Sequence, residues 1–320
     1  MKKVFAVVAL ASLLSGCAEA QTRLSGAGAS FPSKIYQRWF ADLAKEGGHR
    51  VNYQAVGSGS GRKAFLDETV DFGASDDPMK ASDIAKAKRG LVQIPMTGGT
   101  IAFAYNMPDC DLKLTQEQAV QVAIGEINNW SQVGCDDHTM TWVYRSDGAG
   151  TTAALTRSMN EFSDKWKLGV AKSVAWPVGI GNKGNAGVAG NIRNQLGSIG
   201  YVNQSYIKGE VVAAALQNKN GEFITPSVEA GALALNGITL DENLAGVNPN
   251  PEAKGAYPIA TLTWILAYET GNGKKTEAVK ESLLRLLSTE YQENASGLGY
   301  VPLRGDILQK ARDAVEKIAI

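Results

Sequence analysis

The stretch RSDGAGTT, residues 145–152, combines residue types that suit the binding of an oxyanion. Arg145 carries a permanent charge on a forked set of N–H donors that matches a tetrahedral oxyanion, and Asp147 could hold that guanidinium in place. Gly150 and Thr151 follow in a small-residue turn that opens a helical pattern. The alternative for the Arg145–Asp147 pair is a surface ion pair, which contributes little to stability.

Two other small-residue turns also precede helical patterns. SGAGAS, residues 25–30, ends in Ser30, and GSGSG, residues 57–61, contains Ser58. Such turns offer hydroxyls, free backbone N–H groups and the positive end of a helix dipole. Glycine lets the backbone approach a ligand without a side chain in the way. Each turn alone is also typical of an ordinary helix N-cap, but three together predict one shared anion site.

Asp76 follows another run of small residues, Gly73-Ala74-Ser75, in VDFGASDDPM, residues 70–79. A carboxylate that faces an anion is favourable only if the anion carries a proton to donate. Monohydrogen phosphate has that proton and fully ionised sulfate does not, and a site that requires such a polar partner discriminates strongly against analogues. The alternative is that Asp76 caps a turn or a helix.

Other ligand motifs are missing or incomplete. GIGNKG, residues 179–184, fits the dinucleotide pattern, but no acidic residue follows before Glu210, so the expected ribose partner is absent. The chain contains no phosphate-binding GxxxxGK[ST] loop and no GxSxG hydrolase motif. His49 and His138 are the only histidines, and neither lies in a metal-ligand cluster. We expect neither a metal nor a cofactor.

Composition places the chain among globular proteins. Its 320 residues are 44% hydrophobic and 20% charged, enough for one large or two ordinary domains. Lys and Arg number 32, as do Asp and Glu, so general attraction to nucleic acid or anionic lipid is not expected.

The N-terminus resembles a secretory signal. Two lysines precede an apolar run over residues 4–14, which is too short to span a membrane. LSGC, ending at Cys17, is typical of a bacterial lipobox and predicts a signal over residues 1–16 and a lipid on Cys17. Ala-Glu-Ala at 18–20 is a competing site for ordinary signal cleavage.

Cys110 and Cys135 would then remain as an even pair in an exported chain, which suggests a disulfide. In the chain-entropy model this disulfide would contribute roughly 3–4 kcal/mol. Two buried free thiols, or a zinc site with His138, are the alternatives.

Short β-rich runs alternate with amphipathic helical runs, which predicts an α/β fold with two lobes and a cleft. The expected strands are 51–56, 91–96, 100–106, 141–146, 197–203 and 261–269. The expected helices are 31–46, 276–289 and 306–318.

Several motifs together resemble one family, the phosphate-binding proteins of bacterial ABC-type phosphate uptake systems. In order across residues 26–303 they are GAGASFP, VNYQAVGSGSG, VDFGASDDPM, YRSDGAGTT, WPVGIGNKGNAGV, IGYV and LGYVPL. The resemblance implies a two-lobed periplasmic-binding-protein fold, with residues 24–97 and 257–320 in one lobe and 98–256 in the other.

The resemblance also implies roles for individual residues. It places phosphate against Ser30, the Phe31 N–H, Ser58, Asp76, Arg145, Gly150 and Thr151, with Asp147 as the tether of Arg145. Many relatives have threonine where Ser30 stands. The family commonly has serine where this chain has Ala149, so one hydroxyl donor is lost. That loss would cost about 1.5–3 kcal/mol unless water or Thr152 replaces the donor.

The expected function is therefore capture of inorganic phosphate in the periplasm and its delivery to an ABC-type permease, by a monomer that touches the membrane only through its lipid. Two alternatives remain. One is a phosphatase that uses Ser58 or Thr151 as nucleophile, and the other is a surface sensor of phosphate or another oxyanion such as arsenate.

Overall fold

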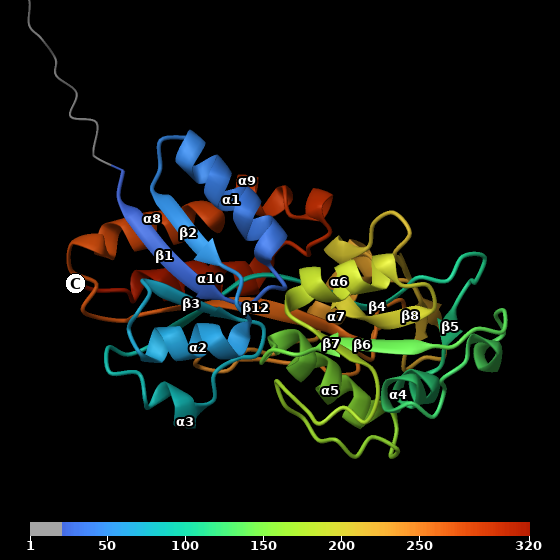
Figure 1. Ribbon diagram of the computed structural model, residues 1–320. Coiled ribbons are helices and arrows are strands. Elements are labelled where there is room, and N and C mark those ends of the chain that lie inside the picture. The colour runs from blue at the N-terminus through green and yellow to red at the C-terminus, as the bar shows by residue number, and fades with distance from the viewer. Residues whose placement is uncertain (1–20) are drawn as a thin grey trace, which may run out of the picture.

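The computed structural model describes residues 21–320, so the expected signal over 1–16, Cys17 and the competing cleavage site at 18–20 lie outside the described residues. Figure 1 shows an elongated mixed α/β molecule with helices on both faces of a long twisted sheet. The strands are β1 (Arg23–Gly28), β2 (Arg50–Gln54), β3 (Phe72–Ser75), β4 (Val92–Tyr105), β5 (Lys113–Leu114), β6 (Thr141–Arg145), β7 (Ile180–Asn182), β8 (Ser198–Asn203), β9 (Val212–Ala213), β10 (Ala215–Gln217), β11 (Phe223–Ile224) and β12 (Ala260–Ala267).

The main sheet has the order β2-β1-β3-β12-β4-β8-β6-β7, and β9 also pairs with β4. Strand β1 is parallel to β2 and β3, and β6 is parallel to β7 and β8. The two parallel sets are separated by β12 and β4, which run antiparallel to their neighbours. A small second sheet has the order β11-β10-β5.

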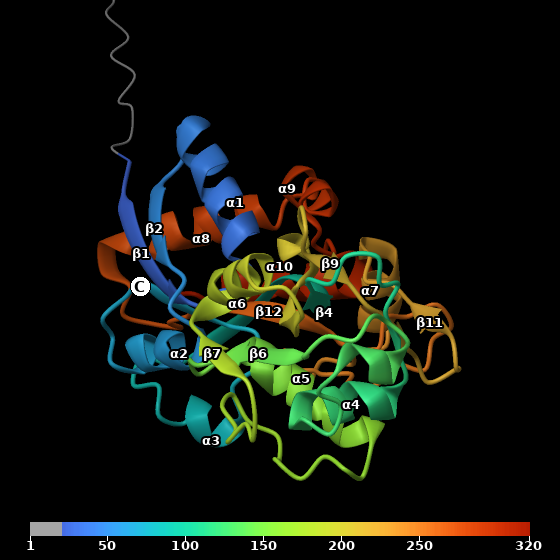
Figure 2. The ribbon, with the colours of Figure 1, turned by 45° about the vertical axis from the view of Figure 1, so that its right-hand side comes forward.

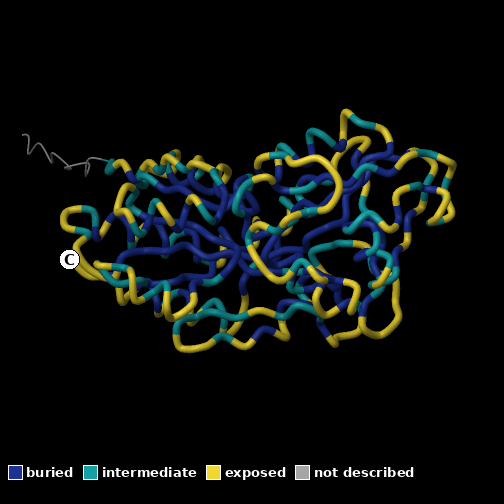
Figure 3. The backbone as a smooth tube through the Cα atoms, turned by 60° about the horizontal axis from the view of Figure 1, so that its bottom comes forward, coloured by how far each residue is buried: buried dark blue, intermediate teal, exposed yellow. Residues whose placement is uncertain are grey.

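Strand β4 joins the two parallel sets. Its residues 92–100 pair with β12, and its residues 101–105 pair with β8. We call β2, β1, β3, β12 and residues 92–100 of β4, with the helices and loops packed on them, the first strand group. Residues 101–105 of β4 with β8, β6, β7 and β9, and the helices and loops packed on them, form the second. Figure 3 shows a continuous buried path through the middle of the molecule between the two groups.

Ten α-helices lie within the described residues: α1 (Ser33–Lys45), α2 (Ser58–Leu66), α3 (Ala81–Ile84), α4 (Gln116–Ile124), α5 (Gly150–Phe162), α6 (Gly184–Asn194), α7 (Val228–Leu235), α8 (Thr276–Leu286), α9 (Thr289–Glu293) and α10 (Gly305–Glu316). In both ribbon views α1 and α2 lie on opposite sides of the first strand group, and α6 and α5 on opposite sides of the second (Figures 1 and 2). All 14 residues of β4 are buried, which is typical of a strand covered on both faces.

Most expected elements are confirmed, with one informative error. The expected strands 91–96 and 100–106 form the single strand β4, because Thr97, Gly98 and Gly99 stay in the ladder with β12. A Cβ at Gly98 would lie 2.2 Å from a methyl carbon of Leu235, so a larger residue there would force that buried side chain to move. Strands β1 and β3 and helix α6 were not expected, because their glycine-rich sequences lack clear periodicity.

The expected disulfide is confirmed: Cys110 and Cys135 are bonded, with their Cα atoms 5.5 Å apart. Within residues 21–320, no helix is both long enough and apolar enough to cross a bilayer.

Candidate anion-binding site

The candidate residues from the first strand group and those from the second meet where parallel strands end. Ser30 and Phe31 follow the carboxyl end of β1, Asp76 follows β3, and Arg145 is the last residue of β6. In open α/β sheets, ligands bind beyond the carboxyl ends of the strands, where the strand order changes direction. The fold therefore brings residues 115 positions apart in the sequence (Ser30 and Arg145) to one place.

Arg145 is held rigidly although it carries a buried charge. Its side chain is only 1% exposed, and its Nε and Nη2 donate to the two carboxylate oxygens of Asp147 at 2.7 and 2.5 Å. Burial alone would raise the pKa of Asp147, but the hydrogen bonds and charge of Arg145 outweigh it and leave that pKa below its usual value. The Gly184 N–H also donates to Asp147, at 3.0 Å. Asp147 thus fixes the Nε–Nη2 edge of the guanidinium, and Nη1 remains to point into the site.

Asp76 is a carboxyl group in an almost dry environment. It is 1% exposed, and its Oδ1 accepts a hydrogen bond from Thr263 of β12 at 2.9 Å. Burial raises the pKa of Asp76 to about 7, although Thr263 and the charge of Arg145 oppose that shift. Asp76 can therefore exist both as an acceptor and as a donor near neutral pH. Thr263 was not expected, but a polar residue inside the apolar strand TLTWIL was a visible signal.

Thr151 links Arg145 to Asp76 across the two strand groups. Arg145 Nη1 donates to Thr151 Oγ1 at 3.3 Å, and that hydroxyl lies 3.4 Å from Asp76 Oδ2. A fixed cation and a titratable carboxyl group therefore flank one small, fully buried hydroxyl. This arrangement suits a protonated oxyanion, because one end of the site supplies donors and the other end supplies an acceptor.

Ser58 and Gly150 bring the first turns of two helices against each other. Ser58 Oγ accepts from the Asp76 N–H at 3.2 Å, so its own hydrogen is free to donate elsewhere. A Cβ at position 150 would lie 2.6 Å from Ser58 Oγ and 2.8 Å from the Asp76 nitrogen, which explains the glycine. The first-turn N–H groups of α2 and α5 lack partners within their own helices, so both helix ends contribute positive potential.

Asn185, which the sequence interpretation did not single out, connects the remaining candidates. Its backbone N–H and its Nδ2 each donate to Ser30 Oγ at 3.0 Å, and Nδ2 also lies 3.3 Å from Thr151 Oγ1. The Asn203 N–H donates to Asn185 Oδ1 at 2.8 Å, which fixes the orientation of the amide. A signal was present: GIGNKGN forms β7 and the start of α6, a fourth glycine-rich turn before a helix.

Asn185 determines which way the neighbouring hydroxyls point. A hydroxyl has one hydrogen to donate, and the lone pairs of Ser30 and Thr151 already accept hydrogen bonds from nitrogen donors. The Ser30 hydroxyl hydrogen is therefore directed away from Asn185 and can serve as a donor to an anion, whereas the Thr151 hydroxyl donates to Asp76 Oδ2. The Phe31 N–H adds another donor, because it has no hydrogen-bond acceptor among residues 21–320.

Ala149 and Thr152 support the site residues indirectly. The Ala149 N–H donates to the Lys172 carbonyl at 2.9 Å, so it serves to fix the loop that precedes α5. The Thr152 hydroxyl lies 2.6 Å from the Tyr201 hydroxyl, which in turn accepts from the Arg145 backbone N–H. Thr152 therefore supports the Arg145 backbone, and it does not take the place of the hydroxyl that serine would supply at position 149.

Comparison with known proteins finds relatives that match nearly the whole chain. The model of the PBP superfamily domain matches residues 15–283. Phosphate-binding protein PstS of Pasteurella multocida (strain Pm70) is 35% identical, over 97% of this chain and 94% of its own length. Phosphate-binding protein PstS of Haemophilus influenzae is 34% identical, over 96% of each chain.

The fold is shared with solved structures as well. The structure of the phosphate-binding protein from Stenotrophomonas maltophilia matches 92% of this chain and 94% of that one, with a TM-score of 0.72 and 22% identity. The two-lobed periplasmic-binding-protein fold expected from the sequence is thereby confirmed. The chain belongs to the PBP superfamily and, within it, to the family of phosphate-binding proteins PstS.

Proposed function

We propose that this chain binds inorganic phosphate outside the cytoplasmic membrane and delivers it to the permease of an ABC-type phosphate transporter. The observation that carries the proposal is the pairing of Arg145 with Asp76 on either side of Thr151. Arg145, the hydroxyl groups of the candidate site and the N-terminal ends of the helices would offset the cost of removing a dianion from water. Asp76 would accept the proton that phosphate carries and sulfate lacks.

In this proposal the two strand groups belong to two lobes that close on the ligand, residues 24–97 with 257–320 and residues 98–256. Contacts between residues of the two groups support a closed arrangement, including Asn185 with Ser30 and the Gly59 N–H with the Gly148 carbonyl at 2.8 Å. The closed form would be what the permease recognises. Phe31, Ser58 and Gly150 would contribute donors, Asp147 would hold Arg145, and a lipid on Cys17 would anchor a monomer to the membrane.

A catalytic role finds little support in the site. A Ser58 or Thr151 nucleophile would need a neighbouring base. Both histidines of the chain lie elsewhere: His49 contacts Glu281 at 2.9 Å, and His138 lies against Gly197. The only carboxylate in hydrogen-bond contact with Thr151 among the described residues is Asp76, which the proposal assigns to proton recognition.

Calorimetric titration of the phosphate-stripped mature protein tests the proposal. We expect one phosphate per chain at neutral pH, and little response to sulfate at pH 8.5, where Asp76 is ionised. If phosphate gives no heat, or if sulfate binds equally well, the proposed ligand is wrong. Arsenate, which carries the same kind of proton, serves as a third titrant, and binding as tight as that of phosphate would support the broader oxyanion alternative.

A further inference from the structure

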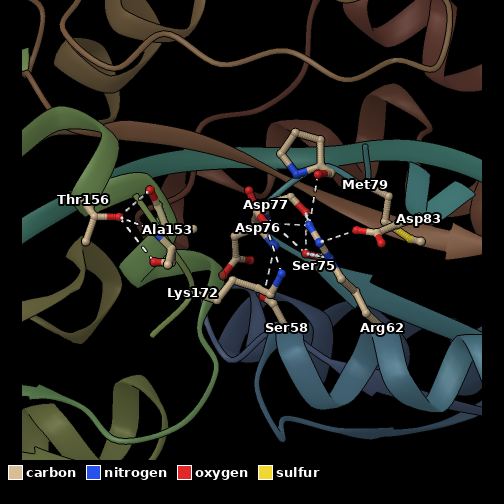
Figure 4. A network of polar contacts seen from close by, with 12 residues as sticks. Ser58, Arg62, Ser75, Asp76, Asp77, Met79, Asp83, Ala153, Thr156 and Lys172 are labelled. Atoms are coloured by element: carbon tan, nitrogen blue, oxygen red, sulfur yellow. Dashed lines mark hydrogen bonds and ion pairs between the residues drawn. The ribbon is translucent and has the colours of Figure 1, made fainter. Parts of the chain in front are cut away.

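A second set of charged side chains lies one residue beyond Asp76, and Figure 4 draws it beside Ser58 and Asp76 of the candidate site. Its centre is Asp77, which is 7% exposed and follows β3. Figure 4 shows Asp77 between Arg62 of α2 and Lys172 of the loop after α5. Arg157 of α5 also pairs with its carboxylate. Three cations from both strand groups thus surround one carboxylate.

The first strand group holds Asp77 in place by itself. Arg62 Nη2 donates to Asp77 Oδ2 at 2.7 Å and to the Pro78 carbonyl at 3.0 Å. Ser75 Oγ donates to the Asp77 carbonyl at 2.6 Å and accepts from the Asp77 N–H at 3.1 Å. The carboxylate is therefore positioned without any help from the second strand group.

The second strand group supplies two cations that pair with this carboxylate. Arg157 pairs with Asp77 Oδ1, and Lys172 Nζ lies 3.6 Å from Asp77 Oδ2. Within residues 21–320, neither cation has another carboxylate within 4.0 Å. The Thr156 hydroxyl accepts from the Ala171 N–H at 3.2 Å, which ties the loop that carries Lys172 to α5.

We propose that Asp77, Arg157 and Lys172 form an ion-pair latch that holds the two lobes closed and so sets the affinity for the anion. The inference rests on the proposed function, since it assigns these residues to closure around that ligand. In an open form, Arg157 and Lys172 would separate from Asp77 and return to water. On closure they would join Arg62 in neutralising the Asp77 carboxylate, which lies next to Asp76.

The latch should act mainly on the rate of ligand release, because paired and partly buried charges lengthen the life of a complex. We expect Arg157→Gln to raise the dissociation rate and the Kd for phosphate roughly 10-fold, with Lys172→Gln smaller in the same direction. The association rate should change little. Lys165→Gln is the matched control, because Lys165 pairs with Glu117 and Glu126 inside the second strand group.

A double-mutant cycle separates the latch from a general loss of positive charge. In an Asp77→Asn background, Arg157→Gln should have little further effect on Kd, because the two residues act as one pair. Equal Kd values and release rates for wild type, Arg157→Gln and Lys172→Gln would overturn the inference. An effect of Lys165→Gln as large as that of Arg157→Gln would overturn it as well.

Distances between nitroxide labels on Lys63→Cys of α2 and Asn160→Cys of α5, both exposed positions, test the latch without ligand. We expect Arg157→Gln to move the ligand-free protein toward longer distances than wild type or Lys165→Gln. Unchanged distances would refute the latch even in a protein that binds phosphate. If wild type fails to bind phosphate, the proposed function is wrong, and the label distances still decide whether the latch exists.

Discussion

The side-chain nitrogen of Asn185 lies 3.0 Å from the Ser30 hydroxyl oxygen; Ser30 follows β1 of the first strand group, and Asn185 lies in α6, which packs on β8 and β6 of the second. The amide donates to an oxygen that would otherwise be free to accept hydrogen bonds from its surroundings. It therefore performs two tasks: it joins the two halves of the site, and it directs the hydroxyl hydrogen toward the ligand.

Removal of this amide should weaken anion binding. We expect Asn185→Ala to raise the Kd for phosphate about 10- to 100-fold, which corresponds to about 1.4–2.8 kcal/mol. Asn185→Asp should be worse, because a carboxylate there accepts the hydroxyl hydrogens and repels the anion. Asn194→Ala, an exposed position at the end of the same helix, is the control. Wild-type affinity in Asn185→Ala, measured by calorimetry, would show that the hydroxyls need no such orientation.

Arg145 should not be replaceable by lysine. Arg145 makes two hydrogen bonds to Asp147 and still presents Nη1 to the site, whereas a lysine ammonium has no forked geometry. We expect Arg145→Lys to weaken phosphate binding by about 1.5–3 kcal/mol, the range for a hydrogen bond to a charged group. Arg193→Lys, an exposed arginine at the end of α6, should bind as wild type does. Undiminished affinity in Arg145→Lys would remove this residue from the site.

Much of the fold followed from local pattern. The amphipathic spacing of Tyr36, Trp39, Phe40 and Leu43 predicted α1, and the structure buries all four of these side chains. The glycine-rich strands β1 and β3 could not be predicted in the same way, because their residues are set by close approach: a Cβ on Gly26 would lie 2.2 Å from the Phe72 ring. Such contacts involve distant residues, so local periodicity does not reveal them.

The residues of the candidate site also divide into those that a local sequence pattern predicts and those that it does not. Turn chemistry pointed to Ser30, Ser58 and Thr151, because small residues before helices are a local signal. Asn185 and Thr263 act through partners more than 30 residues away, so no local pattern reveals their roles. The family resemblance supplied the roles of the site residues. Asp77 lies in the motif VDFGASDDPM, but its pairing with Arg157 could be recognised only from the structure, which places α5 beside it.

The disulfide should stabilise the second strand group without affecting ligand affinity. Cys110 and Cys135 lie 25 residues apart, so the chain-entropy model gives a contribution of roughly 3–4 kcal/mol. Cys110 lies beyond Tyr105, whereas the candidate site lies at the other end of β8, where Asn203 pairs with Ile101. We expect Cys110→Ser with Cys135→Ser to lower the denaturant midpoint and leave the Kd for phosphate unchanged. A large change in the Kd for phosphate would mean that the conformation of this loop affects the site.

Sulfate binding should depend on pH through Asp76. Above its pKa of about 7, Asp76 is an acceptor that faces a ligand without a proton, and below it the protonated carboxyl can donate to sulfate. The apparent sulfate affinity should therefore rise roughly 10-fold per pH unit as the pH falls toward 7, and level off below. Phosphate, which carries its own proton, should change less.

Asp76→Asn provides the control for that titration, because its amide nitrogen can donate at every pH. We expect the variant to bind sulfate with little pH dependence and to lose discrimination between sulfate and phosphate. Sulfate rejection that persists in the variant, or sulfate binding by wild type that ignores pH, would show that Asp76 does not distinguish the two anions.

The same carboxyl group should limit the stability of the ligand-free protein. Its pKa rises from about 3.8 in the unfolded chain to about 7 in the folded one, so the folded state binds the proton more tightly. The sign follows from proton linkage: stability decreases as the pH rises from about 4 to 7, and the full cost remains above 7. At 1.36 kcal/mol per pKa unit, that cost is at most about 4 kcal/mol.

Asp76→Asn removes this ionisation and keeps an oxygen for the Thr263 hydroxyl, and it loses only the long 3.4 Å hydrogen bond that Thr151 Oγ1 donates to Asp76 Oδ2. We therefore expect the ligand-free variant to unfold at a higher temperature than wild type at pH 8, with the difference shrinking toward pH 4. Calorimetric unfolding of phosphate-stripped samples measures it. A variant less stable than wild type at pH 8 would mean that the ionised carboxylate is better solvated than its burial indicates.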